Sequence, residues 1–122
     1  MDNLDLEGRR ILIVEDDFFV ALDLKQVLDE AGCTVVGTAS SVERALTTIS
    51  GRRIDAALLD VTLERELVFA LADRLSADGV PFVFITCDPT AMPERHWMRP
   101  VISKPYQPPE VLAALAAVMR PG

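Results

Sequence analysis

The chain has 122 residues, half of them hydrophobic and a quarter charged, which suits one folded domain over residues 1–122 and is too short for two. Its net charge of −7 argues against general binding to nucleic acid, whose phosphates would repel it. No apolar run approaches the roughly 18 residues of a membrane span, and the acidic first residues do not resemble a signal peptide. We therefore expect a cytoplasmic protein without membrane or nucleic-acid partners.

Short apolar runs alternate with amphipathic stretches along the chain, which is typical of α/β domains. In chain order we expect strands at residues 10–14, 34–37, 54–60, 80–86 and 101–103. We expect helices at residues 20–31, 42–49 and 63–76, and a last helix that begins after Pro108-Pro109-Glu110.

The stretch between the fourth and fifth predicted strands departs from this rhythm. It contains Pro89, Pro93 and Pro100, and proline removes a helical hydrogen bond and restricts the residue before it. We therefore expect a long loop with at most one helical turn, where the pattern would otherwise place a fourth helix.

Right-handed crossovers between these strands favour a doubly wound, five-stranded parallel sheet with helices on both faces. The flavodoxin-like strand order 2-1-3-4-5 places strands one and three side by side at the point where the order reverses. Ligands bind there, beyond the carboxyl ends of the strands.

A polar residue follows each of four strands at that edge. Glu15 and Asp16 follow the first strand, Asp60 ends the third, Thr86 ends the fourth and Lys104 follows the fifth. Clustered carboxylates suit Mg²⁺, and a lysine with a hydroxyl suits an anion. The set therefore predicts a site for Mg²⁺ and a phosphoryl group.

Each of these residues also has an ordinary structural interpretation. The acids after the first strand could cap a helix, which accounts best for Asp17, and Asp60 alone could be a turn aspartate. Together they favour metal ligands and a phosphoryl acceptor, since a carboxylate can attack phosphorus to form an acyl phosphate. Carboxylates this close should raise the pKa of at least one of them when no cation is bound.

The same residues resemble the receiver domain of two-component response regulators over essentially the whole chain. The resemblance implies that Glu15 and Asp16 bind metal, that Asp60 is phosphorylated and that Thr62 offers Mg²⁺ its backbone carbonyl. It also implies that Thr86 and Lys104 contact the phosphoryl group and that a cis bond joins Lys104 to Pro105. The implied partner is a sensor histidine kinase or a histidine phosphotransfer protein.

Two departures from the family pattern matter. Val101 stands where the strand-five aromatic switch residue usually lies, and the usual Pro-Gly after the phosphorylated aspartate is missing. The absent aromatic and the short fourth-helix region resemble the FATGUY receivers of alphaproteobacteria, although only Phe84 and Thr86 match their motif. Many of those are single-domain proteins, and several work with HWE-type kinases and in general stress signalling.

Other functions stay open to different degrees. A stand-alone receiver, which is not an enzyme beyond its own phosphoryl transfer and hydrolysis, would signal by protein contact or act as a phosphate sink. A phosphatase of the haloacid dehalogenase type needs a second aspartate where this chain has Thr62, which argues against it. A degenerate receiver that binds a partner without phosphorylation remains the alternative.

Overall fold

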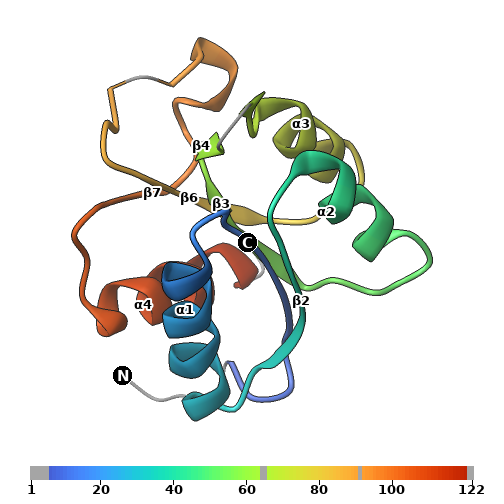
Figure 1. Ribbon diagram of the computed structural model, residues 1–122, viewed down its shortest axis with the longest axis vertical. Helices are drawn as coiled ribbons and strands as arrows, with labels where there is room; N and C mark the ends of the chain where they lie inside the picture. The colour runs from blue at the N-terminus through green and yellow to red at the C-terminus, as the bar shows by residue number, and fades with distance from the viewer. Residues whose placement is uncertain (1–5, 64–65, 91, 121–122) are drawn as a thin grey trace.

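The computed structural model describes residues 6–63, 66–90 and 92–120. Within these ranges the helices are α1 (Phe18–Glu30), α2 (Val42–Ile49), α3 (Phe69–Ala77) and α4 (Pro108–Met119), with a 3-10 turn, η2 (Glu94–His96). The strands are β1 (Arg10–Val14), β2 (Thr34–Ala39), β3 (Ala56–Asp60), β4 (Thr62–Leu63), β5 (Glu66–Leu67), β6 (Phe82–Thr86) and β7 (Val101–Ser103). Figure 1 shows how they are arranged.

The main sheet is parallel and has the order β2-β1-β3-β6-β7. Because β6 and β7 are the fourth and fifth strands expected from the sequence, the flavodoxin-like order 2-1-3-4-5 is confirmed. Val14 pairs with Leu59 across β1 and β3, so the residues that follow these strands leave the sheet side by side. The order thus places the acidic residues at one edge.

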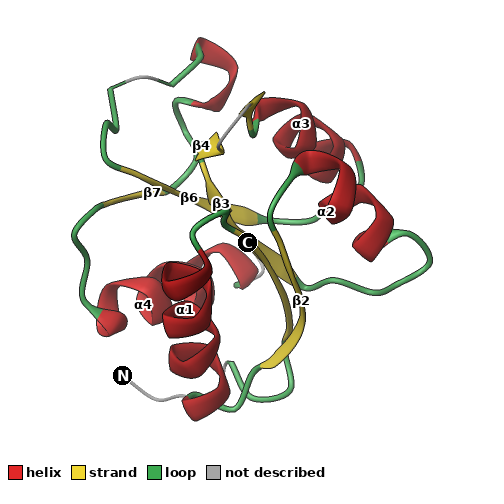
Figure 2. Ribbon diagram, in the orientation of Figure 1, coloured by secondary structure: helices red, strands yellow, loops and turns green. Residues whose placement is uncertain are grey.

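Helices cover both faces of the sheet, α1 and α4 on one and α2 and α3 on the other (Figure 2). Alternate strand residues enter two cores: Ile11 and Ile13 pack on the α1 and α4 side, while Leu12 and Val14 pack on the α2 and α3 side. Burial on both faces explains why the strands are almost continuously apolar. Gly32 ends α1 with a φ of 86°, a conformation that suits glycine.

The third helix begins later than the sequence predicted, at Phe69 rather than Leu63, and the prediction was wrong for residues 63 and 66–68. Residues 64 and 65 of the predicted helix lie outside the described residues. Residues 62–63 and 66–67 pair instead as a small antiparallel hairpin, β4–β5. Val61 and Leu63 are buried while Thr62 between them is exposed, a two-residue period that a helix would break. The amide of Val68 donates to the carbonyl of Val61 and closes the hairpin.

The segment between β6 and β7, residues 87–100, contains only the short turn η2 in its described part. This confirms the prediction of a loop in place of a fourth flanking helix. Pro93 precedes η2 in extended conformation, as expected of a residue that cannot continue a helix. No helix in the described ranges is long and apolar enough to cross a membrane.

Candidate functional site

Three carboxylates meet at the carboxyl ends of β1 and β3. Glu15 and Asp60 are buried, with 4% and 7% of their surfaces exposed, and Asp16 is partly exposed. Each offers an oxygen, and these oxygens all lie within 4.8 Å of one another. Buried carboxylates this close need a cation, because charge left unpaired in the interior is costly.

The Lys104 side chain reaches the acids from the end of β7. Its Nζ lies 3.2 Å from Glu15 Oε1 and 3.5 Å from Asp60 Oδ2. Partial burial lowers the pKa of Lys104, but the charges of Asp60 and Glu15 outweigh that effect and the net shift is upward. The Lys104–Pro105 bond is cis, as the resemblance implied.

Glu15 is the carboxyl whose pKa rises, to about 7 from an ordinary 4.5. Burial is the main cause, followed by the contact and charge of Asp60, while the amide of Asp17 and the charge of Lys104 act in the opposite direction. The pKa of at least one carboxyl is raised, as predicted, although burial contributes more to the rise than the neighbouring carboxylate does. With this pKa, Glu15 is about half protonated at neutral pH.

Asp17 is not part of this cluster. Its carboxylate caps α1 and accepts hydrogen bonds from the amides of Phe19 and Val20 at 2.9 and 3.2 Å. The structural interpretation is therefore correct for Asp17. The cap fixes the start of α1 next to the acidic cluster.

Thr86 lies at the end of β6 and is buried, with 4% of its surface exposed. Its hydroxyl accepts a hydrogen bond from the amide of Asp88 at 3.1 Å and faces the Asp88 carbonyl at 3.4 Å. The Asp88 carboxylate accepts hydrogen bonds from the hydroxyl and amide of Thr90, which lower its pKa. Thr86 thus engages the loop here, and Asp88 does not join the acidic cluster.

The remaining predicted positions lie at the periphery of the site. Thr62 is exposed at the start of β4, two residues beyond Asp60. Val101 is half-buried in β7, and no aromatic side chain occupies its position. The structure places Thr62 near the carboxyl end of β3, where the resemblance puts a backbone ligand.

Residues 11–116 match the family described as the response regulator receiver domain. This match covers far more than half of the chain. The chain belongs to the response regulator receiver family. Its strand order is the flavodoxin-like one that was predicted from the pattern of strands and helices.

Curated and solved relatives refine the assignment. The chain is 33% identical over 89% of its length to the phyllosphere-induced regulator PhyR of Methylorubrum extorquens, of which it spans 43%. It is 28% identical to the chemotaxis protein CheY of Thermotoga maritima, with 93% of this chain and 99% of that one covered. The solution structure of SdrG from Sphingomonas melonis is 38% identical, with a TM-score of 0.81 over 95% of this chain and 98% of that one. The PhyR and SdrG matches are to receivers of the alphaproteobacterial type.

The receiver's donor set fits Mg²⁺. Carboxylate oxygens are the ligands that this ion prefers, and the ammonium of Lys104 lies against two of the three acids. Glu15, Asp16 and Asp60 would hold the ion, with the Thr62 carbonyl as a further ligand.

Sequence reasoning missed one buried polar residue of the receiver, His96. A single histidine in a proline-rich loop carries no local signal of burial, yet only 2% of its surface is exposed. Its nearest polar partner, Asp73, is 23 residues away along the chain. Only the tertiary structure brings the two together.

Proposed function

We propose that this receiver accepts a phosphoryl group on Asp60 from a phosphohistidine, in a reaction that depends on Mg²⁺. The observation that carries the proposal is the convergence of three carboxylates and Lys104 around the buried end of β3. A carboxylate oxygen of Asp60 attacks phosphorus while the P–N bond to the donor imidazole breaks. The electron pair returns to the ring nitrogen, and an acyl phosphate remains on Asp60.

The other residues of the site have distinct roles in this proposal. Glu15 and Asp16 would hold Mg²⁺, and the bound ion would neutralise charge on the phosphoryl oxygens. Lys104 is within reach of Asp60 and would pair with a phosphoryl oxygen. Thr86 would donate its hydroxyl hydrogen to another, in place of the Asp88 carbonyl that the hydroxyl now faces at 3.4 Å.

The phosphodonor is proposed to be a sensor histidine kinase, of the HWE type, or a histidine phosphotransfer protein. An apolar surface suited to a helix lies at the start of α1, where Phe18, Phe19 and Leu22 are 70%, 77% and 51% exposed. Asp17 caps this same end of the helix, so the surface adjoins the acidic cluster. Exposed aromatic side chains at this density are typical of protein contacts.

The receiver domain, residues 1–122, is proposed to pass its signal on by protein contact or to drain phosphate from its kinase. Two similar solved structures are named as an anti-anti-sigma factor PhyR and as the PhyR stress response regulator. These names support a role in stress signalling. The alternative is a degenerate receiver that binds its partner without phosphorylation. The complete set of acids, threonine and lysine argues against it, while Val101 in place of the usual aromatic residue leaves room for it.

Intact mass after incubation with Mg²⁺ and acetyl phosphate separates these functions. Wild type should gain one phosphate when Mg²⁺ is present and none when a chelator is present during the incubation. Asp60→Asn should gain none in either case. Equal labelling of the asparagine variant would disprove the assignment of Asp60, and no labelling of wild type would favour the degenerate receiver. Phe18→Ala should slow labelling from a phosphorylated kinase and leave labelling from acetyl phosphate unchanged.

A further inference from the structure

The buried His96 fixes the β6–β7 loop to the core of the domain. Its ring stacks on Phe69, with centroids 5.9 Å apart, and meets Phe84 and Phe82 edge to face at 5.5 and 6.0 Å. These three rings come from α3 and β6, so one side chain of the loop packs against two elements. A polar ring needs a hydrogen-bond partner in such an apolar environment.

Asp73 of α3 provides that partner. His96 Nε2 lies 2.9 Å from Asp73 Oδ1, and Arg95 holds the same carboxylate with two hydrogen bonds of 2.9 and 3.1 Å. The bonds from Arg95, and then that from His96, lower the pKa of Asp73, so the group is ionised and can only accept. Nε2 is therefore the protonated nitrogen, and buried Nδ1 has no partner among the described residues.

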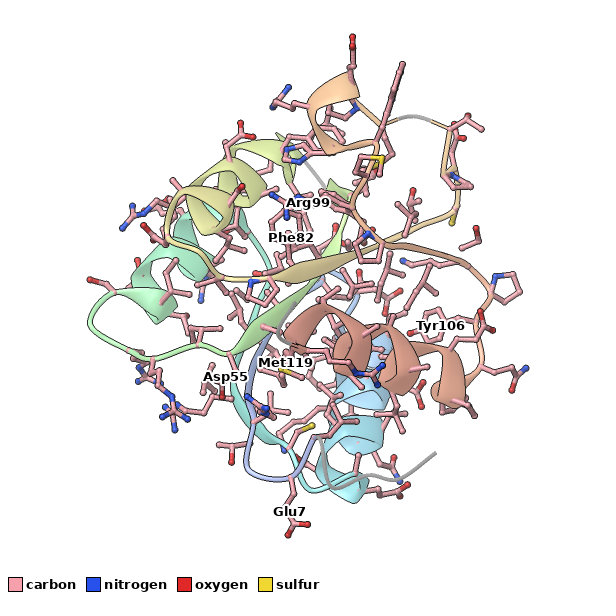
Figure 3. The ribbon with its side chains drawn as sticks, turned by 180° about the vertical axis from the view of Figure 1, so that it is seen from behind. Glu7, Asp55, Phe82, Arg99, Tyr106 and Met119 are labelled. Carbon is pink, nitrogen blue, oxygen red and sulfur yellow. The ribbon has the colours of Figure 1, made fainter. Side chains whose placement is uncertain are left out.

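A second attachment reinforces the first. The Arg99 guanidinium lies 4.8 Å from the centre of the Phe82 ring (Figure 3) and donates a hydrogen bond of 2.6 Å to Ser76 of α3. The loop thus contacts α3 from both sides of His96. No comparable set of bonds joins the loop to the acidic cluster among the described residues.

The loop also connects two residues of the proposed phosphoryl site. It starts directly after Thr86 and ends at the strand that precedes Lys104. At its start, the Asp88 amide donates to the Thr86 hydroxyl. Rotation of the Thr86 side chain toward a phosphoryl group would move its hydroxyl away from the Asp88 amide and carbonyl, which frees the first turn of the loop.

We propose that His96, Asp73 and Arg95 form a latch that holds the loop in its unphosphorylated position and opposes the turning of Thr86. His96 is then a positioning residue: it acts on Thr86 through the loop and does not touch the phosphoryl group. The proposal rests on the proposed function of Asp60 and adds its regulation. Interactions present in only one of two states shift the balance between them, so the latch sets how readily the phosphorylated state forms.

Removing the latch should therefore tighten the binding of a phosphoryl mimic. With beryllofluoride and saturating Mg²⁺ as the probe, calorimetry should give Asp73→Ala an apparent Kd about fivefold lower than that of wild type. Asp78→Ala is the matched control, because Asp78 forms a similarly exposed ion pair with Arg74 on α3, away from the loop. Its Kd should equal that of wild type.

Three further measurements separate a latch from general support of the fold. Asp73→Ala should melt at a lower temperature than wild type while binding the mimic more tightly, whereas simple destabilisation would not tighten binding. His96→Phe keeps an aromatic ring among the phenylalanines, removes the bond to Asp73, and should tighten binding in the same way. Fluorescence of Trp97, the only tryptophan, reports the loop directly, since its indole donates to the Met92 carbonyl.

The outcomes are distinguishable. An unchanged or weaker affinity in both Asp73→Ala and His96→Phe, with normal binding by wild type, would overturn the latch and leave the proposed function intact. Failure of wild type itself to bind beryllofluoride would overturn the proposed function, and the latch with it.

Discussion

The two halves of the site are built differently. On the β1 and β3 side, the acids directly follow strands that are buried on both faces, and Glu15 and Asp60 are themselves buried. On the β6 and β7 side, Thr86 is followed by a long loop, and its hydroxyl contacts the amide and the carbonyl of Asp88 in that loop. The first half is fixed by the core and suits metal binding, whereas the second can exchange one set of bonds for another and suits a response.

Stability should differ sharply between the two halves. Leu58 of β3 is 1% exposed, so Leu58→Ala should cost about 2–5 kcal/mol of unfolding free energy through lost burial and the cavity left behind. Met98 in the loop is 96% exposed, and Met98→Ala should stay within about 0.5 kcal/mol. Urea denaturation measures both, and a large loss in Met98→Ala would show that the loop is part of the core rather than a peripheral segment.

Mg²⁺ tests the rigid half directly. A ligand that binds only the native state should stabilise wild type by about 2.7 kcal/mol at a hundredfold excess over Kd. Asp16→Ala should lose most of this gain, measured as the rise in melting temperature. Asp17→Ala is the control: it should lower the starting stability by about 1 kcal/mol, because a helix cap is lost, and still respond fully to Mg²⁺. An equal response in both variants would remove Asp16 from the metal site.

The protonation of Glu15 should make the metal-free protein depend on pH. Between pH 4.5 and about 7 the native carboxyl keeps a proton that the unfolded chain has released, so stability is highest below this window and falls as pH rises through it. The loss should be on the order of 2 kcal/mol, because the raised pKa belongs to a group that is still partly solvated through its neighbours. The free energy of unfolding, measured by denaturation across this pH range, should depend less on pH in Glu15→Gln and in wild type with saturating Mg²⁺. A stability that rises with pH in wild type alone would contradict the raised pKa.

The same contrast explains how far the sequence could predict this molecule. The rigid half follows from local signals: an apolar run, then a polar residue, repeated in a βα rhythm that fixes which strand ends meet. The β4–β5 hairpin was missed because a contact that is distant in the sequence supports it. The Glu66 carboxylate accepts a hydrogen bond from the Val42 amide at the start of α2. The His96–Asp73 pair was missed for the same reason, as neither residue has a local pattern that indicates the other.

The smallest expected effect is a local loss of protection in the loop. If Thr86 turns to a phosphoryl group, the Asp88 amide loses its hydrogen-bond acceptor and should exchange faster with solvent. Hydrogen exchange with and without beryllofluoride and Mg²⁺ should therefore show its largest change across residues 88–99, while amides of β1 and β3 stay unchanged.

This pattern would place the response in the loop rather than in a strand-five side chain. Val101 has no hydroxyl or ring that could change its position when Thr86 moves. A movement of Thr86 would therefore be transmitted through the backbone of the loop that follows it. The Asp88 amide is the most sensitive probe because its acceptor is the Thr86 side chain itself, whereas the amide of Lys104 bonds to the Thr86 carbonyl and should keep its protection. Exchange that changed mainly in α4, with residues 88–99 unaffected, would mean that the signal leaves through that helix and that the loop is a fixed part of the scaffold.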